Sequence, residues 1–69
     1  MLSVYVTTVN NSEKPPFRQM DGWELDNGET NDYGETVWRY EVTGTKKRDV
    51  RVFLTFAYAT EMIESFQIY

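Results

Sequence analysis

The chain has 69 residues, 41% hydrophobic and 16% aromatic, which predicts one small folded domain spanning residues 1–69 rather than a disordered segment. The absence of cysteine and histidine excludes disulfides, the usual zinc ligands and the common nucleophilic triads, so we expect no catalytic residue, no cofactor and no metal site. The formal net charge of −4 argues against nucleic acid as the partner, and the lack of a signal-like or membrane-spanning apolar run favours a cytoplasmic setting with no membrane contact.

The first predicted element is a strand over residues 2–9. Leu2, Val4 and Val6 alternate with polar and aromatic residues, which is the period of a half-buried strand. Residues 10–12 end this strand, and an acidic insertion follows over about 10–35. Because an unstructured segment of that length is unusual in a small domain, we expect residues 22–25 to form a short strand or a docked segment, anchored by Trp23.

The next two elements are predicted to form a β-hairpin. Residues 36–43 and 48–56 both alternate between apolar and polar side chains, and the Gly44 turn region over 44–47 lies between them. Two alternating runs around a short glycine-containing turn are typical of a hairpin.

The tail over residues 57–69 changes period. One stripe at helical spacing contains Ala59, Met62, Ile63, Phe66 and Tyr69, which predicts an amphipathic helix that docks on the sheet. An alternative makes residues 65–69 a final edge strand. The predicted fold class is α+β, with a three-stranded, mainly antiparallel sheet and a C-terminal helix; a small all-β barrel is the alternative.

The most unusual feature is an acidic stretch over residues 21–35 that contains no lysine or arginine. Its carboxylates are Asp21, Glu24, Asp26, Glu29, Asp32 and Glu35. Three interpretations are open: a solvated loop, a weak cation site, or a recognition surface for a basic partner. The spacing does not match an EF-hand loop. Trp23 and Tyr33 lie among the acids, and aromatic side chains supply much of the binding energy of interfaces, so we favour the recognition surface.

Two other surfaces could carry function. A basic group at the predicted hairpin tip consists of Lys46, Lys47, Arg48 and Arg51. We interpret it first as a lysine-rich turn that discourages edge-to-edge pairing of strands, and as an alternative it could contact nucleic acid. Alternatively, Tyr5, Val37 and Phe53 could form an apolar strip on the outer face of the sheet, through which a small structural subunit would form a homodimer. We expect the 10–35 insertion to fold over this strip and cover it, because the insertion must pack somewhere; the strip is an interaction surface only if it stays uncovered.

In its size, its negative charge and its single-domain organisation, the chain is similar to the small acidic inhibitors that bacteriophages make against host or defence enzymes, including anti-CRISPR proteins and DNA mimics. No motif carries this resemblance. It implies a non-catalytic protein, acting in the host cytoplasm if phage-encoded, that occupies a basic nucleic-acid-binding surface of an enzyme. The predicted partner is therefore a protein with a basic surface.

Overall fold

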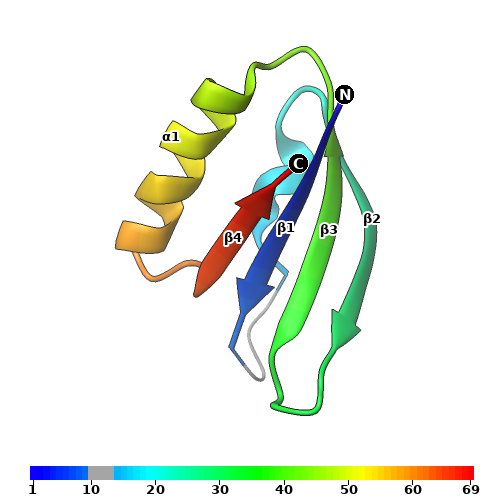
Figure 1. Cartoon of the computed structure of the whole chain (residues 1–69), viewed down its shortest axis with the longest axis vertical. Coiled ribbons are helices and arrows are strands. Elements are labelled where there is room, and N and C mark those ends of the chain that lie inside the picture. The colour runs from blue at the N-terminus through cyan, green and yellow to red at the C-terminus, as the bar shows by residue number, and fades with distance from the viewer. Residues whose placement is uncertain (10–13) are drawn as a thin grey trace.

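The chain folds into a four-stranded antiparallel sheet, one α-helix and one short 3-10 helix, as seen in a computed structural model that describes residues 1–9 and 14–69 (Figure 1). The elements in chain order are β1 (Leu2–Thr8), η1 (Pro16–Gln19), β2 (Trp23–Thr30), β3 (Thr36–Val42), α1 (Lys47–Ala59) and β4 (Ser65–Ile68). The strand order across the sheet is β2-β3-β1-β4. The predicted α+β class is confirmed, with four strands in place of three. The predicted end of the first strand at residues 10–12 lies outside the described residues.

The two faces of the sheet differ in composition because side chains alternate along each strand. Val4 of β1 pairs with Tyr40 of β3 and with Ile68 of β4, and these three side chains point to the face that carries the core. Their neighbours Tyr5 and Arg39, which are also paired, point to the opposite face. That second face is half-exposed along β1 and β3 and is covered by neither α1 nor η1.

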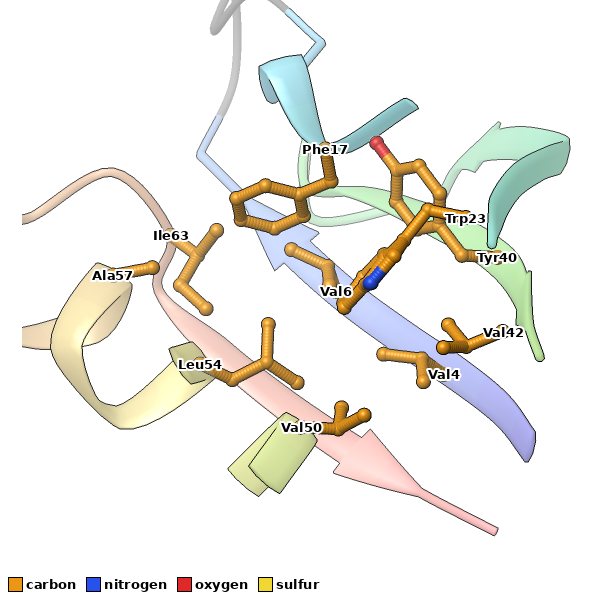
Figure 2. Close-up of a cluster of buried hydrophobic side chains, with 10 residues drawn as sticks. All are labelled: Val4, Val6, Phe17, Trp23, Tyr40, Val42, Val50, Leu54, Ala57 and Ile63. Carbon is orange, nitrogen blue, oxygen red and sulfur yellow. The ribbon is translucent and has the colours of Figure 1, made fainter. Parts of the chain in front are cut away.

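The core lies between the sheet, α1 and η1. Figure 2 shows ten buried side chains from these elements and the α1–β4 connection pointing toward one another. Phe17 of η1 is central to the aromatic part: its ring lies 5.4 Å from Trp23, 5.8 Å from Tyr40 and 5.1 Å from Phe53. The Tyr40 hydroxyl donates a hydrogen bond to the Pro15 carbonyl, and burial raises the pKa of Tyr40 to about 12.

The predicted hairpin of residues 36–43 and 48–56 is wrong. Residues 48–56 lie inside α1, and β3 pairs with β1 and β2 instead. The run over 48–56 satisfies both periods, since Val50, Leu54 and Ala57 also recur at helical spacing and are buried on one side of α1. A short apolar run cannot be assigned from its period alone when both templates fit.

The predicted tail helix is also wrong, and the alternative of an edge strand is correct. The chain leaves α1 at Thr60 and residues 65–68 pair with β1, with Phe66 opposite Val6. The prediction of a short strand anchored by Trp23 is confirmed, and that strand continues to Thr30. Much of the acidic stretch is therefore part of the sheet.

Candidate protein-binding edge

The acidic stretch forms one edge of the molecule. β2 is an outer strand of the sheet, and its eight residues span about 23 Å at the usual rise of a strand. Glu24 and Glu29 pair with Glu41 and Val37 of β3, so both carboxylates point to the open face and are exposed. Asp21 lies just before the strand and is also exposed. The carboxylates are therefore held apart along a rigid edge.

The turn between β2 and β3 is ordered by one side chain. The Asn31 Oδ1 atom accepts hydrogen bonds from the backbone N–H groups of Tyr33 (2.9 Å) and Glu35 (3.1 Å). Asn31 Nδ2 donates to Glu35 Oε1 at 3.1 Å, and the Asn31 backbone N–H donates to the Glu35 carbonyl at 2.8 Å. An Asn that bonds the backbone of the following residues is a common turn former. The turn thus holds Asp32, Tyr33 and Glu35 in one conformation.

Tyr33 projects from this turn with 88% of its surface exposed. Tyrosine is enriched among the interface residues that carry most of the binding energy, so an exposed tyrosine in an ordered turn is a candidate contact residue. We refer to the carboxylates along β2 and in the turns on either side of it, together with Tyr33, as the acidic edge, which comprises Asp21, Glu24, Asp26, Glu29, Asp32, Tyr33 and Glu35.

Trp23, predicted as an anchor for a partner, lies in the core with only 4% of its surface exposed. It begins β2 with its side chain on the covered face, packed on Phe17 and Tyr40. The docking expected for residues 22–25 is confirmed, and the register of pairing turns the Trp23 side chain away from solvent.

Asp26 is partly neutralised by a cation. It lies at a bulge in β2 and accepts a hydrogen bond from Arg39 Nη1 at 2.7 Å, and Arg39 Nη2 lies 3.1 Å from Glu41. The same guanidinium lies 5.9 Å from the ring centroid of Tyr5. Of the six acids, Asp26 is therefore the one that contributes least free charge to the edge.

Glu64, from a distant part of the chain, lies beside Glu35 at one end of the acidic edge. Its carboxyl lies close to that of Glu35, and its backbone N–H donates to the Thr7 carbonyl at 2.7 Å. The bonds from Asn31 and Glu64 lower the pKa of the Glu35 carboxyl. The bond to Glu35, with burial and the repulsion of the Glu35 charge, raises the pKa of Glu64. Only the assignment of residues 65–68 to a strand beside β1 could have placed Glu64 here from the sequence.

The basic residues predicted at a hairpin tip lie instead in the first turns of α1 and the residue before it. These basic residues are Lys46, Lys47, Arg48 and Arg51. Because α1 is not a strand, these side chains do not protect a sheet edge. They lie at the end of the molecule away from the β2–β3 turn (Figure 1).

The predicted apolar strip is divided between two faces. Tyr5 and Val37 lie on the open face of the sheet, whereas Phe53 lies on α1 and packs against Phe17 and Trp23 on the covered face. The expectation that the insertion would cover this strip holds for Phe53 alone. The misassignment of residues 48–56 as a strand caused this error.

The described residues hold no group of three or more Asp or Glu side chains placed to bind a metal ion. A hollow of about 570 Å³ lies at the C-terminal end of α1 and is lined mainly by apolar residues. In residues 1–9 and 14–69, no helix is long and apolar enough to span a membrane.

Comparisons with known proteins bear on none of these surfaces. No protein-family model matches the sequence, and no curated protein and no solved structure matches it.

Proposed function

We propose that the chain is a non-catalytic binding protein whose acidic edge docks on a basic surface of another protein. The observation that carries this proposal is the ordered turn that presents Tyr33 among carboxylates at the end of an acidic edge strand. Charge steers a basic partner to such a surface, and an exposed aromatic side chain supplies contact area once the partner is close.

The order of the edge supports recognition over a solvated loop. A solvated loop needs no fixed geometry, whereas here β2 pairs with β3 over its whole length and Asn31 bonds Tyr33 and Glu35 across the turn. A preorganised surface loses less conformational entropy on binding than a mobile one.

The finer proposal is that the partner is a nucleic-acid-handling enzyme and that this chain inhibits it by occupying its basic groove. Carboxylates on an edge strand repeat every two or three residues, so they are several Ångströms apart, while DNA carries one charge per roughly 1.7 Å of axis. The edge is thus a sparser line of charge than DNA, and Tyr33 provides the additional contact.

The test is affinity capture from a lysate of the source or host cell with three baits: the native chain, a six-acid variant and Tyr33→Ser. The six-acid variant replaces Asp21, Glu24, Asp26, Glu29, Asp32 and Glu35 by their amides. We expect the native chain to capture a basic protein that a double-stranded DNA oligonucleotide displaces.

We expect the six-acid variant to fold normally, because amides keep the hydrogen-bond acceptors of the turn, but to bind roughly a hundredfold more weakly. Tyr33→Ser should weaken binding without changing its salt dependence. Capture of the same partner by the native chain and the six-acid variant with equal affinity would refute the proposal.

A further inference from the structure

The outward face of α1 is apolar. Val52 and Phe56 are 67% and 68% exposed, and Ala59 is also exposed. Together with Thr55 they recur at i, i+3, i+4 and i+7, which is the spacing of a helix face that packs against another element. Because the opposite face of α1 already packs on the sheet, this helix is apolar on both sides over its last two turns.

The charges around α1 have the wrong sign for an isolated helix. Three cations, Lys46, Lys47 and Arg48, and one acid, Asp49, lie at its N-terminus, where the helix dipole is positive, so the net charge there is still positive, and Lys46 makes no side-chain capping bond. Glu61 and Glu64 follow its C-terminus, where the dipole is negative. Both sets of charges would be favourable beside a second helix of the same charge pattern running in the opposite direction.

The hollow at the C-terminal end of α1 fits such a neighbour. Its lining includes the apolar side chains of Ala59 and Met62 and the carboxylates of Glu61 and Glu64. Met62 is 46% exposed. A site of this kind accepts an apolar side chain flanked by cations.

We propose that α1 pairs with α1 of a second copy of this chain, antiparallel, about a two-fold axis near Thr55 and Phe56. Val52 of one copy then lies against Ala59 of the other, and each Phe56 lies near the axis. Arg48 and Arg51 of each copy then lie near Glu61 and Glu64 of the other. One antiparallel arrangement therefore makes both the apolar contact and the two charge contacts.

A second copy fits this face better than an anionic membrane surface. A membrane would attract the basic end of α1 but would repel Glu61 and Glu64 at the other end. A helix of 13 residues is about 20 Å long, so the contact is smaller than a standard interface. We therefore expect a weak dimer, with a Kd on the order of 10 µM.

This pairing does not rest on the proposed function, because β2 and α1 lie on opposite sides of the molecule (Figure 1). The dimer would present two free acidic edges. Tyr33→Asp should keep the dimer, and Phe56→Asp should keep an intact acidic edge, so failure of either proposal would leave the other standing.

The first test is sedimentation equilibrium of the full chain over roughly 1 to 300 µM, a range that brackets the expected Kd. We expect the average mass to rise from 8.2 kDa toward twice that value. Phe56→Asp should remain monomeric and keep its thermal unfolding midpoint. Met20→Asp, which changes another exposed apolar residue, should still dimerise. A native chain that stays at the monomer mass throughout, or that binds phosphatidylglycerol vesicles as a monomer, overturns the proposal.

Charge reversal tests the choice of a second copy. Arg51→Glu and Glu61→Arg should each weaken the homodimer at least tenfold, because each places like charges together twice. An equimolar mixture of the two variants should associate at least as well as the native chain, because both contacts become attractive. No recovery in the mixture would contradict the charge pairing.

The orientation is tested by spin labels, since the chain has no native cysteine. In an antiparallel pair, labels on Thr55→Cys lie close together, while labels on Lys47→Cys lie about 25 Å apart along the helix axis. Electron–electron distance measurements that find both label pairs close would indicate a parallel pair and overturn the arrangement.

Discussion

Glu35 and Glu64 are the residues whose ionisation the fold changes in opposite directions. The pKa of Glu35 is lowered from its ordinary value of 4.5. Its favourable contribution to the free energy of unfolding is therefore present above pH 4.5 and is lost as the pH falls through the pKa of the folded state. The pKa of Glu64 is raised from 4.5, so its contribution is present below pH 4.5 and is lost as the pH rises through its folded pKa. The pair should therefore stabilise the fold most near pH 4.5, where the two carboxyls share one proton.

Glu64→Gln tests this pair. The introduced amide donates to Glu35 at every pH, so the free energy of unfolding should no longer fall as the pH rises above 4.5. The measurement is urea unfolding at several pH values, with Glu61→Gln as a control that removes an acid from the same connection. A pH dependence identical in the native chain and the Glu64→Gln variant would show that the hydrogen bond is not formed in solution.

At the scale of elements, the shape of the acidic edge depends on how closely β2 approaches β3. Gly28 pairs with Trp38, and a Cβ atom at Gly28 would lie 2.5 Å from Trp38 Cε3. The indole cannot easily move away, since its Nε1 donates a hydrogen bond to Thr8 Oγ1 at 2.9 Å. Trp38 thus fills the space that the glycine leaves and ties β2, β3 and β1 together.

Gly28→Ala is therefore expected to destabilise the protein by about 1–3 kcal/mol through overpacking. Without the contact the substitution would be stabilising by about 0.5–1 kcal/mol, because glycine is unfavourable within a strand. The measurement is denaturant unfolding of Gly28→Ala, with Asn27→Ala at the exposed neighbouring position as the control. It decides whether Gly28→Ala lowers or raises the free energy of unfolding. An unchanged or raised free energy of unfolding would mean that the two strands do not approach so closely.

At the scale of the whole molecule, one aromatic cluster holds all the layers together. Phe17 from η1, Trp23 from β2 and Phe53 from α1 meet within 6 Å, with the Trp23 and Phe53 rings 5.7 Å apart. A domain of 69 residues has a total stability of only about 3–10 kcal/mol, so the loss of one of these rings is a large fraction of it.

Trp23→Ala should cost about 3–5 kcal/mol and leave much of the chain unfolded near room temperature. Tyr33→Ser, in the exposed turn, should leave the free energy of unfolding within about 0.5 kcal/mol of the native value. Circular dichroism melting curves of the two variants check both expectations. A folded Trp23→Ala variant with a near-native midpoint would show that the aromatic cluster is not the main support of the fold.

Local sequence was sufficient to predict the first strand, the strand over 36–42, the α+β class and the docking of Trp23. These features depend on local period and composition: β1 alternates cleanly because one of its faces is buried, and a tryptophan in a chain this small is seldom left in solvent. The absence of cysteine and histidine was likewise enough to exclude the chemistries that need them.

The choice between helix and strand for residues 48–56 and 57–69 depended on long-range pairing. Both runs fit the period of a helix and that of a strand, and the strands that decide between the two lie far away in the chain. β3 is paired on both sides, by β1 and β2, so the segment that follows it covers the sheet as a helix. β1 had one free edge, and β4 pairs there. The same non-local pairing set which face each side chain occupies. It separated Phe53 from Tyr5 and brought Glu64 to Glu35, because a strand's faces are fixed by register and not by its own sequence.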